Sequence, residues 1–271
     1  MRKLVLLLAL IIGFAPLARA EGDSPLRMLM TGDDSRGWEA VGRLNIAGRA
    51  MCTGALIAPD IVLTAAHCLF DKDTKERFAA SGIEFLAGWR NGRASAHARV
   101  RRTVILPEYV YDPEDPARRV RNDIALLQLT RPIRKTSIVP FQTAERPAKW
   151  DQVEVVSYAR DRAQSPSLQE SCHVLARQSG TLVLSCDVDF GSSGAPVFVM
   201  KDGVPYIVSV VSAKAEIGTR KVSLAAALEK PLAELMAGIE NEVTTKNGLP
   251  IVRRLTDDGS PRHGGAKFLR P

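Results

Sequence analysis

Three short segments constrain the possible folds of this chain more than any other part of its sequence. The run LTAAHC places His67 directly after an apolar stretch, NDIALLQL places Asp123 directly before one, and GSSGAP places Ser193 between glycines. Apolar runs of this length, bounded by turn residues, are typical of short buried strands. We therefore expect a β-rich fold that brings a histidine, an aspartate and a serine from three distant parts of the chain into one site.

Histidine, aspartate and serine together can turn a hydroxyl group into a nucleophile. A serine hydroxyl is a weak nucleophile near neutral pH, so it needs a base within hydrogen-bond reach when it attacks a carbonyl carbon. His67 is the only one of the four histidines in a recognisable motif, so it is the candidate base. Asp123 would hold its imidazole in one tautomer. Taken alone, His67 could be a core histidine beside a disulfide, and Asp123 could cap a helix or a turn.

The glycines around Ser193 indicate a tight backbone turn. Gly191 and Gly194 let the backbone present N–H groups to the oxyanion that develops when a carbonyl is attacked. Pro196 and the apolar run after it strengthen this interpretation. The alternative is a plain glycine-serine turn between two strands.

Short strand patterns separated by turn residues dominate the rest of the sequence. Strands are expected at 41–46, 55–63 with a turn at Pro59-Asp60, 83–86, 98–106, 124–129, 153–158, 173–176, 181–186, 195–200, 206–212 and 222–228. Many short strands favour antiparallel barrels, the first over about 38–140 and the second over about 150–228. His67 and Asp123 would come from the first barrel and Ser193 from the second, with a cleft between the barrels.

From about Trp38 to about Leu228, these motifs resemble the trypsin/chymotrypsin family of serine proteases. The resemblance implies an all-β fold of two six-stranded antiparallel barrels and a C-terminal helix, which in this family packs on the second barrel. The helix is expected at Pro231–Val243, where Pro lies in the first turn and apolar residues share one face.

The same resemblance assigns a role to each motif residue. His67 matches the general base, Asp123 the orienting carboxylate and Ser193 the nucleophile. The N–H groups of Gly191 and Ser193 match the oxyanion hole. The implied activity is that of a serine endopeptidase, which hydrolyses protein or peptide substrates through an acyl-enzyme intermediate. Two alternatives remain, a catalytically inactive, protease-like binding protein and an esterase that uses the same triad.

The four cysteines are expected to form two disulfides. Cys52 and Cys68 match the disulfide that, in this family, joins the strand before the catalytic histidine to the histidine segment. Cys172 and Cys186 are then left to pair with each other. A zinc site fits poorly because neither pair has the close spacing of zinc ligands. We expect no metal and no cofactor.

Several departures make the chain more similar to the bacterial, glutamyl-endopeptidase-like branch of the family. Ser192 stands where the digestive enzymes have an aspartate that pairs with a newly freed amino terminus, and Ala195 stands where they have a second glycine. No IVGG-like start is found before Trp38. We therefore expect the oxyanion hole to form without an N-terminal ion pair, and trimming up to about Trp38 to change the rate little.

The substrate pocket is less clearly marked. Asp187 lies six residues before Ser193, where trypsin-like enzymes have the aspartate that selects Arg or Lys. Asp189 is close by, and the alternative for Asp187 is a hydrogen-bonded aspartate beside a disulfide. Ser209 resembles the serine of the substrate-binding strand behind the catalytic aspartate, and Ser212 is a rival placement.

The first 20 residues are typical of a secretory signal, with a basic start, an apolar run and an Ala-Arg-Ala end. A membrane anchor is the alternative, but the apolar run is short and is broken by Gly13 and Pro16. We expect export to the periplasm or the medium. Residues 21–37 would then form an N-terminal segment or a short propeptide, and 244–271 a basic, mobile tail.

The net charge of +7 raises the question of an anionic partner. The basic residues gather at 99–102, 118–121 and the C-terminal tail, without the signature of a nucleic-acid-binding fold. We expect a solvated basic surface, no nucleic acid and no stable membrane anchor. The chain is expected to be a monomer.

Overall fold

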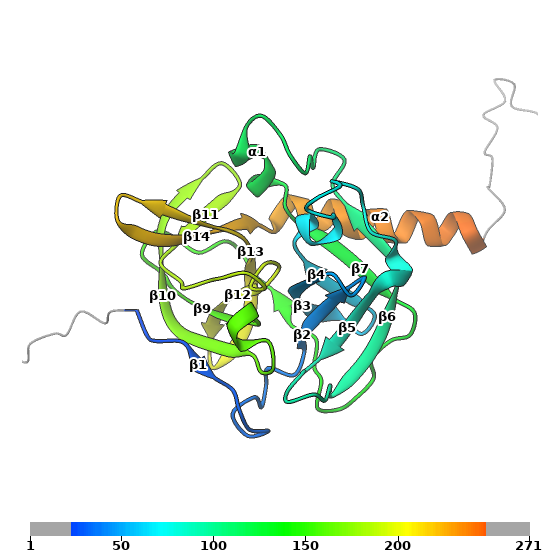
Figure 1. The fold of residues 1–271 in the computed structure, drawn as a ribbon, viewed down its shortest axis with the longest axis horizontal. Helices are drawn as coiled ribbons and strands as arrows, with labels where there is room; N and C mark the ends of the chain where they lie inside the picture. Colours follow the sequence, from blue (N-terminus) through cyan, green and yellow to red (C-terminus); the bar gives the residue numbers. More distant parts are fainter. Residues whose placement is uncertain (1–22, 248–271) are drawn as a thin grey trace, which may run out of the picture.

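The computed structural model describes residues 23–247 and the side chains up to residue 240. The expected signal at 1–20 lies outside the described residues, as does most of the tail expected at 244–271, whose first residues, 244–247, are helical instead. Two β-barrels lie side by side, and a helix near the C-terminus runs along one of them (Figure 1). The prediction of two six-stranded antiparallel barrels is confirmed.

The first barrel is a closed sheet with the strand order β2-β3-β4-β7-β6-β5. Its strands are β2 (Val41–Ile46), β3 (Ala50–Ala58), β4 (Ile61–Thr64), β5 (Ile83–Ala87), β6 (Ala96–Ile105) and β7 (Ala125–Leu129). Apolar side chains such as Leu44, Leu63 and Phe85 fill the core. The turn at Pro59-Asp60 joins β3 to β4, as the sequence predicts.

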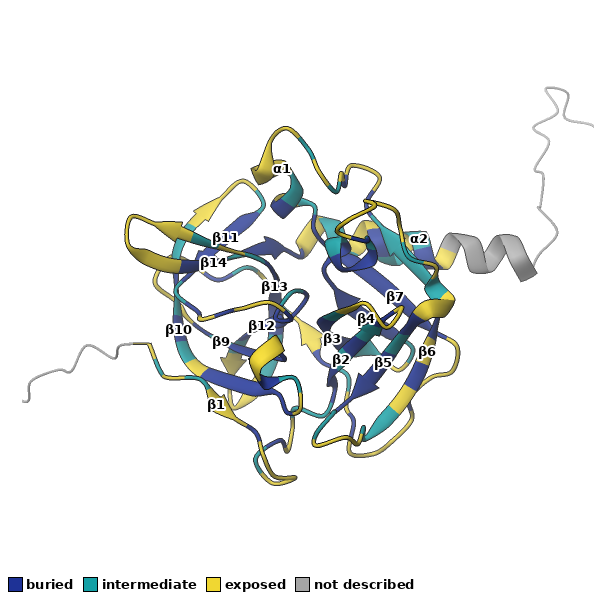
Figure 2. Cartoon of the chain, viewed as in Figure 1, coloured by how far each residue is buried: buried dark blue, intermediate teal, exposed yellow. Residues whose placement is uncertain are grey.

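The second barrel closes because β9 pairs with both β10 and β12. Its strands are β9 (Gln152–Ser157), β10 (Ser167–Gln178), β11 (Thr181–Leu184), β12 (Pro196–Lys201), β13 (Val204–Ile217) and β14 (Arg220–Ala227). Val155, Leu184 and Val197 belong to its core. Figure 2 shows that the buried residues lie inside both barrels. Two short strands add to the second sheet, β1 (Arg27–Met28) beside β10 and β8 (Gln142–Thr143) parallel to β13.

The hairpin of β13 and β14 extends well beyond the strand predicted at 206–212. The pairing continues from Ala213 to Ile217, opposite Arg220 to Leu224. Exposed Lys214, Glu216 and Ile217 show that this end of the hairpin lies largely in solvent. A strand segment without a buried face lacks the alternation of apolar and polar residues that marks a strand in the sequence.

The C-terminal helix α2 (Glu229–Asn247) packs against β6 and β7 of the first barrel. The expectation that it packs on the second barrel is wrong. Leu235 and Ile239 are buried, and the guanidinium of Arg102 on β6 donates to the carbonyl groups of Gly238 and Ile239. The apolar face of the helix was predicted from the sequence, but the surface that covers it depends on tertiary contacts.

The remaining elements are short. They are the 3₁₀ helices η1 (Ala66–Leu69), η2 (Ala80–Gly82) and η3 (Arg160–Arg162), and the helix α1 (Pro116–Arg121). The side chain of Asp115 caps α1 by accepting a hydrogen bond from the N–H of Ala117. Among residues 23–247, no helix is long and apolar enough to cross a membrane.

Both expected disulfides are present, Cys52–Cys68 and Cys172–Cys186. The first joins β3 to η1, the 3₁₀ helix that carries His67. The second joins β10 to the chain just after β11. Sequence separations of 16 and 14 residues correspond to a stabilisation of about 3 kcal/mol each, mainly because the bonds restrict the unfolded chain.

Candidate active site

His67 and Asp123 meet because of how β4 and β7 pair. The two strands are antiparallel, and Thr64 at the end of β4 lies opposite Ala125 at the start of β7. The chain that follows β4 and the chain that precedes β7 therefore lie at the same end of the barrel. This arrangement places η1, with His67, beside Asp123.

Asp123 is fully buried and accepts three hydrogen bonds. One oxygen, Oδ1, accepts from the backbone N–H of His67 at 2.8 Å. The other, Oδ2, lies 2.6 Å from the Nδ1 atom of His67 and accepts from the hydroxyl of Ser212 at 2.5 Å. A buried carboxylate is costly unless it is partnered, and these donors supply the partners. The bond to Asp123 puts the proton of a neutral His67 ring on Nδ1 and leaves Nε2 free to accept one.

Ser193 lies in a sharp turn that is held against the first barrel. The N–H of Thr53 on β3 donates to the carbonyl of Ser193, and the Thr53 hydroxyl donates to that of Gly191, both at 2.8 Å. Gly194 has φ +78°, and a Cβ there would overlap the Thr64 hydroxyl and the Thr53 carbonyl. The turn thus needs glycine for both its backbone conformation and its close approach.

The turn leaves two N–H groups available. Within residues 23–247, the N–H groups of Gly191 and Ser193 donate to no protein acceptor. Gly191 adopts φ +102°, a conformation that favours glycine. Two unpaired N–H groups beside a serine hydroxyl can bind an oxyanion.

Ser192 is fully buried beneath this turn, and its hydroxyl joins a polar network. The Ser192 hydroxyl donates to the hydroxyl of Ser157 at 3.2 Å or to the carbonyl of Tyr158 at 3.3 Å. It accepts from the N–H of Asp189 at 3.3 Å and from the guanidinium of Arg162 at 3.4 Å. Arg162 is itself only 9% exposed. A buried guanidinium therefore lies near the backbone turn that carries Ser193.

A cleft of about 990 Å³ lies between the barrels and includes both His67 and Ser193 in its lining. The first barrel and the segments following β4 contribute His67, Met51 and Phe70. The second contributes Gly191, Ser193 and the stretch Val211 to Lys214 of β13. Among the described residues, no hydrogen bond joins the Ser193 hydroxyl to His67.

Asp187 does not line this cleft, so its predicted place in the pocket is not supported. Its side chain is exposed, and its backbone N–H donates to the side chain of Gln169 at 2.8 Å. Asp189 lines the cleft instead, and its carboxylate pairs with Lys214 at 2.8 Å. The hydrogen bond from Lys214, followed by that from the Phe190 N–H, lowers the pKa of Asp189. The spacing of six residues before Ser193 therefore does not place Asp187 in the cleft.

Of the two serines considered on β13, Ser212 and not Ser209 lies beside Asp123. The hydroxyl of Ser209 donates to the carbonyl of Ala226 at 2.6 Å, within the second barrel. Ser209 therefore lies away from Asp123 in the structure, and Ser212, the rival placement, is the serine in contact with it. Sequence reasoning missed Thr53, which supports the turn from the other barrel.

The described residues bring one group of three potential metal ligands together, Cys52, His67 and Cys68. Both sulfur atoms are joined in a disulfide and therefore cannot bind a metal as thiolates. The expectation of no metal and no cofactor stays a prediction.

The side chain of Phe190 lies at the cleft between two basic residues and is 60% exposed. The ammonium of Lys214 lies 4.3 Å from the ring centroid, and the guanidinium carbon of Arg160 lies 5.2 Å from it. These distances fit cation–π contacts. The three side chains define a mixed aromatic and cationic rim, which the sequence analysis did not identify.

Comparison with known proteins agrees with this architecture. The family model described as Trypsin matches residues 31–229. Human cathepsin G is 35% identical over 89 residues, which is 33% of this chain and 30% of that protein. Human serine protease 56 is 34% identical over 96 residues, or 35% of this chain and 14% of that protein. The matched part of the chain thus spans less than a third of each of these relatives.

Among solved structures, the "Structure of Glu endopeptidase in complex with MPD" is similar to this chain in fold. The TM-score is 0.66 at 17% identity, over 81% of this chain and 98% of that one. This similarity agrees with the likeness to glutamyl endopeptidases expected from the sequence. The family model, which covers most of the two barrels, shows that the chain belongs to the trypsin family.

Proposed function

We propose that this chain is an exported serine endopeptidase in which Ser193 is the nucleophile, His67 the general base and Asp123 the orienting carboxylate. The observation that carries the proposal is the pair of contacts from one aspartate to both the ring and the backbone of His67. Such a pair fixes the ring and leaves Nε2 as its basic atom. Ser193 lines the same cleft as that ring.

In the first half of the reaction, the Ser193 hydroxyl oxygen attacks the carbonyl carbon of the peptide bond while its proton passes to His67 Nε2. Asp123 stabilises the imidazolium that forms, because its carboxylate remains charged and in contact with Nδ1. The N–H groups of Gly191 and Ser193 bind the oxyanion. The carbon–nitrogen bond then breaks, and His67 returns the proton to the leaving amine.

The second half of the reaction releases the acyl group. A water molecule loses a proton to His67 as its oxygen attacks the ester carbonyl. The same two N–H groups bind the second oxyanion. Collapse of that intermediate breaks the bond to the Ser193 oxygen, which takes its proton back from His67. The free enzyme is restored.

The proposed oxyanion hole does not depend on an ion pair with a new amino terminus. Ser192 offers no carboxylate for such a pair, and its hydroxyl is bonded to local groups around Ser157 and Arg162. The hydrogen bond from the Ser192 N–H to the Asp189 carbonyl, 2.8 Å, also supports the turn. We infer that the oxyanion hole is ready once the chain has folded.

The preference for Arg or Lys that Asp187 suggested has no support from its position outside the cleft. We propose no other preference for the side chain before the scissile bond. The proposal of export is supported by two disulfides, which persist in oxidising compartments.

A digest of a peptide library tests the activity. The oxidised protein should cleave peptides, and Ser193→Ala should reduce turnover by at least three orders of magnitude because nucleophile and base act as a unit. Ser137→Ala, at an exposed serine outside the cleft, is the matched control and should keep the parent rate. Hydrolysis of esters without peptides would favour the esterase. A parent protein that turns over neither substrate would favour the binding protein.

A further inference from the structure

The segment of residues 23–29, here called the N-terminal strap, is fixed to the second barrel along its length. Ser24 and Ser171 of β10 are joined by three hydrogen bonds. The Ser24 N–H donates to the Ser171 carbonyl at 2.7 Å, the Ser24 hydroxyl donates to the same carbonyl at 3.4 Å, and the Ser171 N–H donates to the Ser24 hydroxyl at 2.8 Å. Further on, β1 pairs with β10, and Leu29 is fully buried. No motif in the sequence predicts this attachment.

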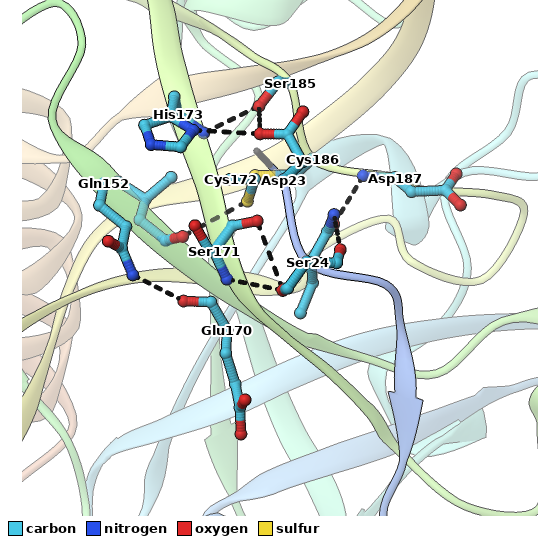
Figure 3. Close-up of a disulfide and its surroundings, with 12 residues drawn as sticks. Asp23, Ser24, Gln152, Glu170, Ser171, Cys172, His173, Ser185, Cys186 and Asp187 are labelled. Carbon is cyan, nitrogen blue, oxygen red and sulfur yellow. Dashed lines mark hydrogen bonds and ion pairs between the residues drawn. A yellow bond between two sulfur atoms is a disulfide. The ribbon is translucent and has the colours of Figure 1, made fainter. Parts of the chain in front are cut away.

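The first described residue of the strap is also held in place. The carboxylate of Asp23 accepts a hydrogen bond from the Ser185 hydroxyl at 2.6 Å and lies 3.1 Å from Nδ1 of His173. Arg220 of β14 lies 3.6 Å from its other oxygen. Figure 3 shows Asp23 and Ser24 beside the Cys172–Cys186 disulfide, with Asp187 on the next stretch of chain. The strap therefore begins next to the segment that leads into the active-site turn.

One buried side chain connects the strap to that segment. Gln169 of β10 is 3% exposed, and both ends of its amide are bonded. Its Nε2 atom donates to the carbonyl of Ser24 at 2.9 Å, and its Oε1 atom accepts from the backbone N–H of Asp187 at 2.8 Å. No other side chain in the described residues bonds both to the strap and to the stretch 187–192.

Asp187 is six residues from the proposed nucleophile, and residues 188–191 between them line the cleft. The carbonyl of Asp189 accepts from the Ser192 N–H, and the carbonyl of Phe190 accepts from the Arg160 N–H at 2.7 Å. Gly191 follows directly. A shift at Asp187 is therefore transmitted along a short bonded stretch to the Gly191 N–H. Oxyanion donors lose most of their effect when they are misplaced by about an ångström.

We propose that Gln169 is a positioning residue that couples the N-terminal strap to the oxyanion hole, so that residues 23–29 are a working part of the enzyme. This inference rests on the proposed function and extends it. It opposes the expectation from the sequence that trimming up to about Trp38 changes the rate little. Removal of the strap leaves the Gln169 amide without its Ser24 partner, and removal of the amide leaves the Asp187 N–H without its side-chain acceptor.

The test compares Gln169→Leu with Gln152→Leu. Gln152 of the neighbouring strand β9 also donates from its side chain to a β10 carbonyl, that of Glu170, but it has no bond to the strap or to 187–192. The full chain is exported so that the leader at 1–20 is removed. On a peptide that the parent cleaves, Gln169→Leu should lower kcat by roughly tenfold with KM within about twofold, because substrate binding is kept and oxyanion binding is weakened. Gln152→Leu should match the parent in both constants.

A second variant begins at Arg27, so that it lacks Asp23 and Ser24 but keeps β1, Leu29 and Gln169. Its kcat should fall to a similar extent. Combined with Gln169→Leu, it should cause little further loss, because the two changes break the same connection. This variant also keeps the test decisive if Gln169→Leu fails to fold.

A kcat equal to that of the parent protein in either single variant would overturn the coupling. So would a double variant whose kcat loss is the full product of the two single losses. A structural readout separates this outcome from failure of the proposed function. In a Ser193→Ala background, hydrogen exchange at Asp187–Gly191 should be faster with Gln169→Leu than with Gln152→Leu, whether or not the parent is a peptidase. Equal exchange in the two variants would refute the coupling by itself.

Discussion

Replacement of Ser212 by alanine removes one of three donors to the buried carboxylate of Asp123. The hydroxyl of Ser212 and Nδ1 of His67 both contact the same oxygen, Oδ2, at 2.5 and 2.6 Å. Without the hydroxyl, only contacts from His67 hold the carboxylate, and it can turn away from the ring. A hydrogen bond to a charged group contributes about 1.5–3 kcal/mol, so we expect the free energy of unfolding to fall by about 2 kcal/mol.

Part of that loss should appear in catalysis. If about 1.4 kcal/mol of it is lost from the transition state, kcat falls about tenfold. The matched control is Ser209→Ala, on the same strand. Its hydroxyl is also buried and also bonded, but to the carbonyl of Ala226. Ser209→Ala should cost about 1 kcal/mol of stability and leave kcat unchanged.

The assay is steady-state kinetics on a cleaved peptide together with urea unfolding for all three proteins. The decisive quantity is the ratio of the two kcat losses. Unchanged kcat in Ser212→Ala, or an equal loss in Ser209→Ala, would refute the assignment of Ser212 as the support of Asp123.

Two further predictions concern pH and a disulfide. Burial, and then the charge of Glu170, raise the pKa of Glu154 from 4.5 to about 7. Between these two pH values the folded state therefore holds a proton on Glu154 that the unfolded state has released. Stability contributed by that proton is present below pH 4.5 and is lost as the pH rises to about 7, so Glu154→Gln should raise Tm at pH 8 but not at pH 4. The double change of Cys52 and Cys68 to serine should lower the free energy of unfolding by about 3 kcal/mol, as measured by urea titration.

Much of the fold was predictable because buried strands carry a readable pattern. Val41–Ile46 was predicted with the bounds that β2 has in the structure. The outer end of β13 was missed because its side chains face solvent on both sides. The helix α2 was predicted, but its packing surface was not, since an apolar face does not specify which barrel covers it.

The candidate site was predictable where one short motif carries the chemistry. His67 and Asp123 were predicted to meet from the short motifs around them, and the structure brings them into contact. Asp187 depended on counting residues from Ser193, and Ser209 depended on the resemblance of its strand. A shift of two or three positions changes which side chain faces the cleft. Gln169 has no motif at all. Its position between Ser24 and Asp187 arises only when three separate segments have folded together.

Covalent labelling of Ser193 gives the sharpest test of the proposed nucleophile. The oxidised parent protein is treated with a fluorophosphonate probe, and the intact mass and the modified peptide are determined. We predict one adduct, on Ser193, with none in Ser193→Ala and a labelling rate at least a hundredfold lower in His67→Ala. A parent protein that stays unlabelled, that is labelled at another serine, or that is labelled equally fast in His67→Ala would contradict the proposed nucleophile and base.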